Sequence, residues 1–101
     1  MSALELTPTQ RRRLKQISHH LKPLMQMGKE GPSEAFMRQL LEQLEAHELI
    51  KVKILNNCEF TVEEIETPMA EADITLVQKV GHIYTVYKAR KENPHIHLPK
   101  R

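Results

Sequence analysis

The order of hydrophobic and polar residues along this chain follows two periods, one typical of helices and one typical of strands. After Ser33, apolar residues recur at helical spacing and would cover one face of a helix, with charged residues on the opposite face. Residues 49–55 change to strict alternation of apolar and polar positions, which is typical of a strand with one buried face. Helices and strands are therefore both expected, in separate segments of the chain.

Capping residues and prolines predict where the other helices begin and end. A capping box at residues 7–10, with Pro8 as the first helical residue, predicts a helix to about residue 22, where Pro23 would end it. A second capping box, at residues 61–64, predicts a third helix through about residue 71. Because Pro68 lies inside this segment, we expect the third helix to be broken or kinked.

Strand-like composition occurs in four segments, residues 24–27, 49–55, 74–80 and 83–89. The last two are joined by so short a connection that they should form an antiparallel hairpin. The predicted order is α-β-α-β-α-β-β, and strands that alternate with helices imply a largely parallel sheet. We therefore expect an α/β fold, a compact two-layer domain with a four-stranded mixed sheet over residues 1–90. Residues 91–101 should form a basic, mobile tail.

Charge is unevenly distributed, although the formal net charge is only +2. Residues 1–29 hold six Lys and Arg against one acid, residues 30–78 hold three against eleven, and residues 79–101 hold six against one. Both ends of the chain are therefore basic and the middle is acidic. The single cysteine, Cys58, excludes an internal disulfide, and no apolar run approaches the roughly 20 residues of a membrane span. We expect a cytoplasmic protein with no membrane contact.

Basic side chains gather on one side of the first predicted helix. An arc about 100° wide, by helical geometry, holds Arg11, Arg12, Lys15, His19 and Lys22. No acid lies four residues further along to balance these charges, as it would on an ordinary surface helix. This arrangement favours an anion-binding ridge over a merely solvated face.

A loop bounded by two glycines joins the first predicted strand to the second helix. It consists of Gly28, Lys29, Glu30 and Gly31, and its glycines would let the backbone turn sharply and approach a partner closely. The free N–H groups at the start of the following helix suit an anion such as phosphate, and Lys29 adds a positive charge. An ordinary strand-to-helix turn would contain the same short motif, so this alternative stays open.

Catalytic and metal-binding patterns are not found in this sequence. It has neither the GxGxxG dinucleotide motif nor the P-loop motif, and Cys58 has no base nearby in sequence. The histidine pairs at residues 19–20 and 95–97 lack the further ligands of a metal site. We therefore expect no enzyme activity, no cofactor and no bound metal.

The remaining chemistry is that of a basic binding surface, made of the ridge, the loop and Lys88 near the end of the last strand. Lys51 and Lys53, on one face of their strand, fit phosphate contact and simple solubility equally well. Such charge binds phosphate whatever the nucleotide sequence. With two Tyr and two Phe, base stacking would be sparse, so the arrangement is closer to a KH domain, in which a GXXG loop clamps the backbone.

The chain resembles the CRM domain in three ordered segments: LTPTQRRRLKQISHHLKPLMQMGKEG, AHELIKVKILNN and VQKVGHIYTVYKA. The resemblance covers nearly all of residues 4–90 and is with the small stand-alone bacterial form, the YhbY-like proteins. It implies an α/β fold similar to the C-terminal domain of translation initiation factor three. It also implies binding to structured RNA and association with precursors of the large ribosomal subunit. The family's GxxG loop falls on residues 28–31 and its basic first helix on residues 11–22.

The resulting hypothesis is a non-catalytic protein that binds ribosomal RNA and acts in large-subunit assembly, with a monomer favoured. Its expected RNA-binding residues share the basic helix, the glycine loop and the end of the last strand: Arg11, Arg12, Lys15, His19, Lys22, Gly28, Lys29, Glu30, Gly31 and Lys88. The alternative is a protein-interaction adaptor that uses the acidic middle of the chain. The central expectation is that the first helix and the glycine loop share a single electropositive surface.

Overall fold

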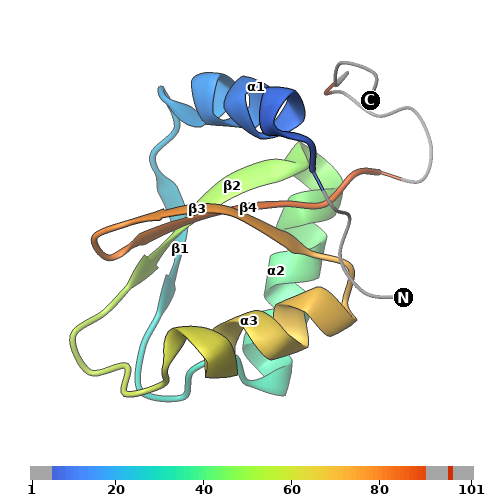
Figure 1. Cartoon of the computed structure of the whole chain (residues 1–101). Helices are drawn as coiled ribbons and strands as arrows, with labels where there is room; N and C mark the ends of the chain where they lie inside the picture. The colour runs from blue at the N-terminus through green and yellow to red at the C-terminus, as the bar shows by residue number, and fades with distance from the viewer. Residues whose placement is uncertain (1–5, 91–95, 97–101) are drawn as a thin grey trace.

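A four-stranded mixed sheet with helices on both faces forms the body of the protein (Figure 1). The structure is a computed structural model that describes residues 6–90 and Ile96. Its elements are α1 (Pro8–Ser18), β1 (Pro23–Met27), α2 (Glu34–His47), β2 (Leu49–Ile54), α3 (Val62–Glu71), β3 (Thr75–Val80) and β4 (Ile83–Tyr87). This confirms the predicted α/β class, the element order and the mixed sheet.

The strands lie in the order β1-β2-β4-β3, with β1 at one edge and β3 at the other. β1 is parallel to β2, whereas β4 is antiparallel to both β2 and β3. Three strands thus run in one direction, as expected, but only one neighbouring pair is parallel. The connection through α3 places β3 one position away from β2 in the sheet. β4, the second strand of the hairpin, lies between them.

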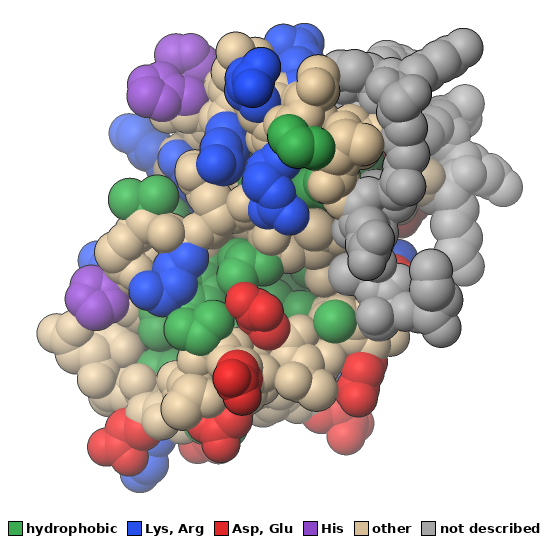
Figure 2. All heavy atoms as spheres, in the orientation of Figure 1, with side chains coloured by type: hydrophobic (Ala, Val, Ile, Leu, Met, Phe, Trp, Pro, Cys, Tyr) green, Lys and Arg blue, Asp and Glu red, His purple; other side chains and the backbone are tan. Residues whose placement is uncertain are grey.

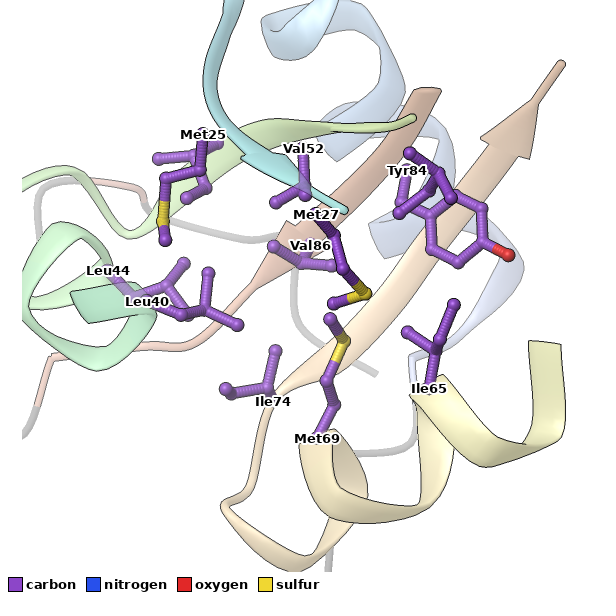
Figure 3. Close-up of a cluster of buried hydrophobic side chains, with 12 residues drawn as sticks. Met25, Met27, Leu40, Leu44, Val52, Ile65, Met69, Ile74, Tyr84 and Val86 are labelled. Carbon is purple, nitrogen blue, oxygen red and sulfur yellow. The ribbon is translucent and has the colours of Figure 1, made fainter. Parts of the chain in front are cut away.

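The main core lies between the sheet and the two helices α2 and α3. Leu40 and Leu44 of α2 point toward Met25 of β1, while Met69 of α3 points toward Met27 (Figure 3). All five side chains are at least nine-tenths buried, so this cluster is the principal apolar contact of the fold. It holds β1 and α2 together and so fixes the segment between them.

α1 packs on the opposite face of the sheet, where a second core cluster contains Leu14, Leu49, Val77 and Tyr87. The expectation of two layers is therefore corrected: α1 adds a third layer (Figure 1). The alternation in β2 concealed this, because the face that carries Lys51 and Lys53 also carries the buried Leu49. A face with two lysines gave no sign that a helix covers one end of it.

The helix starts follow the sequence closely, but two ends differ from expectation. The capping boxes at Thr7 and Thr61 are formed, and Ser33 caps α2. α1 ends at Ser18, one turn before the expected end. α3 runs without a break through Pro68, so the expected break is wrong. Buried side chains on both sides of the proline hold α3 on the sheet, and this packing outweighs the hydrogen bond that proline removes.

Glu48 is fully buried between α2 and β2 and holds the chain that follows β4. Its carboxylate accepts hydrogen bonds from the main-chain N–H groups of Arg90 at 3.0 Å and Ile96 at 2.8 Å. The Arg90 guanidinium donates to the carbonyls of Glu45 and Ala46 at the end of α2, at 2.6 and 2.8 Å. The tail expected at residues 91–101 lies outside the described residues, apart from Ile96.

Candidate nucleic-acid interface

Most Lys and Arg side chains and most Asp and Glu side chains on the face shown in Figure 2 lie toward opposite ends of the molecule. In Figure 2, Lys and Arg side chains gather over α1, whereas Asp and Glu side chains lie at the end that contains α3. The acids of α3 are exposed: Glu63, Glu64, Glu66 and Glu71. The charge division found along the sequence is therefore a division in space, and a polyanion would approach the α1 end.

The α1 end contains a shallow hollow of about 420 Å³ lined mostly by cationic and imidazole side chains: Arg12, Lys15, Gln16, His19 and His20. The structure thus brings together three of the five predicted ridge residues, and the exposed Lys22 follows shortly afterwards in the chain. His20 was missed, because ideal helical geometry directs it away from the ridge. α1 ends at Ser18, and the turn at residues 19–20 carries both imidazoles to the same hollow, with ring centroids 5.5 Å apart.

The cations of α1 have no acidic partner within the part of the chain that the structure describes. The ion pair found there joins Arg38 and Glu34 of α2, with a nitrogen–oxygen distance of 3.7 Å. Arg12, Lys15 and Lys22 are exposed. Unpaired, solvated cations on one surface keep their full charge available for a ligand.

Arg11 differs from the rest of the predicted ridge. Its guanidinium donates to the carbonyl oxygen of Leu76 at 3.1 Å and to that of Val77. These carbonyls belong to β3, so Arg11 fastens α1 to the sheet. The structure therefore gives this predicted site residue a structural partner, which lies 65 positions away in the sequence.

The glycine loop lies near the beginning of α3, and its second glycine has a packing role. Gly31 is buried at φ +62°, and a Cβ there would lie 2.8 Å from Cγ of Phe60. A Cβ on Gly28 would lie 3.2 Å from Oδ1 of Asn57. The N–H of Gly31 donates to the carbonyl of Gly28 at 3.0 Å, which closes the turn. Gly31 is thus explained by the fold itself, as in the alternative that the sequence left open, whereas a Cβ on Gly28 would come closest to the side chain of the exposed Asn57.

Lys29 and Glu30 are exposed at the tip of this loop. Lys29 lines a small hollow together with Asn57, Glu59, Phe60 and Glu64. Two carboxylates therefore share its surroundings, and they reduce the positive potential that Lys29 would present to phosphate. The loop is the less basic of the two predicted contacts.

The ridge and the loop lie at opposite ends of β1 (Figure 1). The five residues of β1 separate them by roughly 16 Å at the rise of an extended strand. The expectation that the first helix and the loop share a single electropositive surface is therefore corrected, because the loop lies at the far end of β1 from α1 and shares its surroundings with Glu59 and Glu64. A ligand that contacts both has to run along β1.

The remaining predicted lysines lie elsewhere. Lys88 is half-buried just after β4, and its N–H donates to the carbonyl of Glu48 at 2.9 Å, near the end of α2. Lys51 and Lys53 lie on the sheet face that α1 covers in part, and Lys53 is exposed. This face therefore extends the positive charge from α1 toward the middle of β2.

Two features bear on other functions. Within the described residues, no group of three or more His, Cys, Asp or Glu side chains is placed to hold a metal ion. None of the helices described is both long enough and apolar enough to cross a membrane.

Fold and charge together define a class: a small α/β domain with a four-stranded mixed sheet and one strongly basic end. The chain belongs to the CRS1/YhbY (CRM) domain family, whose model matches residues 6–88, and this confirms the resemblance found in the sequence.

Individual relatives match over almost their whole length. A Bacillus subtilis protein named as a probable RNA-binding protein, YqeI, is 41% identical over 95 residues, which are 93% of this chain and 99% of the relative. A Haemophilus influenzae protein named RNA-binding protein is 33% identical over 97 residues, covering 95% and 97% of the two chains. The solution structure of the Staphylococcus aureus protein SAV1595, described as a candidate RNA-binding protein, matches with a TM-score of 0.70 and 35% identity. That match covers 94% of this chain and all of that one.

Proposed function

We propose that this protein is a non-catalytic RNA-binding protein that uses the basic end of the molecule around α1. The observation that carries the proposal is the group of exposed cations on α1 and just after it, Arg12, Lys15 and Lys22, which have no acidic partner among the described residues. The names of the relatives point to the same ligand. Phosphates attract such a surface from a distance, and binding releases the counterions that surround the RNA.

The RNA class that we propose is structured ribosomal RNA in precursors of the large subunit, bound in the cytoplasm. This part of the proposal follows from the resemblance to the YhbY-like proteins. The sheet face with Lys51 and Lys53 supports a ligand larger than a single phosphate, because it continues the positive charge beyond α1. The glycine loop would add a second phosphate contact through Lys29 and free main-chain N–H groups.

A charge-reversal pair with a matched control tests the proposal. Binding to a ribosomal RNA fragment is measured by fluorescence anisotropy at two salt concentrations for wild type, Arg12→Glu/Lys15→Glu and Arg38→Glu. We expect the α1 variant to lose at least tenfold in affinity and to show a shallower salt dependence, by about one unit of slope per lost phosphate contact. Arg38→Glu reverses one positive charge on the exposed face of α2, half of the charge change in the α1 variant, and should change affinity little.

Sedimentation of a lysate tests the cellular role. At low salt the protein should be found with precursors of the large ribosomal subunit, and at high salt it should leave them.

An RNA affinity that does not change in the α1 variant would contradict the proposed interface. Partners that survive nuclease treatment would instead support an adaptor that uses the acidic α3 end.

A further inference from the structure

The structure contains a groove that neither the ridge nor the loop accounts for. It lies along β1, has a volume of about 440 Å³, and is lined by Pro23, Leu24, Met25, Gln26, Gln39 and Gln43. β1 is an edge strand, and α2 supplies the opposite wall through Gln39 and Gln43. Every lining residue is uncharged, in a protein where 28% of residues carry charge, so the groove differs in chemistry from the surfaces around it.

Resting on the function proposed above, we infer that this groove holds a short unpaired segment of the RNA and contacts its bases through glutamine amides. Lys22 directly precedes β1, and the glycine loop with Lys29 directly follows it. The groove therefore runs between a cation at one end and a cation at the other. Even fully extended, the seven residue-to-residue steps from Lys22 to Lys29 span at most about 23 Å, the length of a few nucleotides.

The glutamine side chains that line the groove suit the edges of bases. Each glutamine amide offers donors and an acceptor, which is the pattern needed to pair with base edges. No hydrogen bond joins the side chains of Gln26, Gln39 or Gln43 to another of the residues that the structure describes, and Gln26 and Gln39 are exposed. Leu24 is 54% exposed beside them, so a base also finds an apolar surface against which to lie.

A recessed groove of this kind favours unpaired RNA over paired RNA. The major groove of an A-form duplex is too deep and narrow for side chains to reach its base edges, and the wide, shallow minor groove does not enter a recess, so glutamines in a recess contact bases that are free of a helix. Phosphates of the same strand would then contact Lys22 at one end and the loop at the other. This arrangement gives the separated ridge and loop a common ligand without bringing them together.

The experiment compares two RNA probes of equal length and composition, a hairpin with a ten-nucleotide loop and a fully paired duplex. The hairpin loop is first selected from a randomised pool by binding to the wild-type protein. Affinities are then measured for wild type, Gln39→Ala/Gln43→Ala and Gln78→Ala. The last is the matched control, because Gln78 lies on β3, at the opposite edge of the sheet.

We expect the double variant to lose about tenfold in affinity for the hairpin and nothing for the duplex, since one lost base contact is worth roughly that factor. The control should bind both probes like wild type, and thermal unfolding should show that all three proteins are folded. Equal losses of affinity for both probes, or no loss for the hairpin, would overturn the inference that the groove binds unpaired bases. Either result would leave RNA binding by α1 intact. A selection that yields no RNA bound by the wild-type protein, together with no binding of the duplex, would overturn the proposed function itself.

Discussion

Phe60 packs against Gly31 so closely that this position of the loop has no room for a side chain. A Cβ on Gly31 would lie 2.8 Å from Cγ of the Phe60 ring. The φ angle of Gly31 is +62°, which glycine adopts without the steric cost that other residues meet. The second glycine of the GxxG motif is therefore required by the fold, whatever ligand the loop binds.

Replacing Gly31 by alanine should therefore lower the free energy of unfolding by about 2–4 kcal/mol. Part of this loss comes from the left-handed backbone, about 1–2 kcal/mol, and the rest from overpacking against the ring. Urea unfolding followed by circular dichroism measures the change.

Gly81 provides the control for this substitution. It has a similar φ of +58°, but a Cβ there would meet no atom within 4 Å. Gly81→Ala should therefore show the backbone cost alone, and Gly31→Ala/Phe60→Ala should return to about the same value. Equal losses for Gly31→Ala and Gly81→Ala would show that the Phe60 ring, which is 39% exposed, simply moves aside.

Features set by neighbouring residues could be predicted from the sequence. The caps at Thr7, Ser33 and Thr61 depend on contacts three residues along the chain, and all three are formed. The alternation in β2 likewise predicted correctly which side chains enter the main core. Local chemistry was sufficient in these cases because the deciding partner lies within one helical turn or one strand.

Features set by distant partners could not be predicted. The bonds from Arg11 to β3 join residues 65 and 66 positions apart, and nothing around Arg11 distinguishes it from Arg12. Likewise, the contact between Phe60 and Gly31 depends on how β2, which lies between them in the sequence, is placed in the fold. The groove at β1 depends on two glutamines of α2 that, in the sequence, belong to an ordinary polar helix face. The uneven distribution of charge was visible in the sequence. Only the fold shows that the basic ridge and the glycine loop lie at opposite ends of β1.

Substitution should separate the roles of Arg11 and Arg12. Arg11→Ala removes two hydrogen bonds from a guanidinium to carbonyls of β3, and we expect it to lower the free energy of unfolding by about 1–2 kcal/mol. Arg12→Ala removes an exposed side chain at the α1 hollow and should leave stability unchanged while weakening RNA binding. Chemical denaturation and anisotropy on the same samples measure both effects. If the two variants lost affinity equally with no loss of stability, Arg11 would belong to the binding surface.

Stability should fall in alkaline solution because of the two tyrosines. Burial raises the pKa of Tyr87 above its ordinary value of 10.0, and the nearby Glu48 raises it further. Burial also raises the pKa of Tyr84, with smaller contributions from Cys58 and Glu66. A folded pKa above the unfolded one means that this stabilisation is complete below about pH 10 and is lost as the pH rises through the folded pKa.

The Tyr87→Phe variant tests this pH dependence, because it cannot ionise at that position. Its urea midpoint should fall less than that of wild type between about pH 9 and pH 11, and the two should have similar pH dependence near neutrality. Ultraviolet titration of the phenol groups checks that wild type ionises at a raised pKa. An identical alkaline decline in both proteins would assign the loss of stability to other groups.

The buried carboxylate of Glu48 should determine how firmly the chain after β4 is held. Glu48→Gln replaces one acceptor oxygen by an NH₂ group, so the N–H of Arg90 or that of Ile96 loses its partner. We expect the free energy of unfolding to fall by about 1–3 kcal/mol, with faster hydrogen exchange at these two amides. Glu45→Gln is the matched control, because Glu45 is exposed and contacts Arg90 through its main-chain carbonyl alone. Unchanged exchange at Arg90 and Ile96 in Glu48→Gln would mean that packing beside α1, and not the carboxylate, holds this segment.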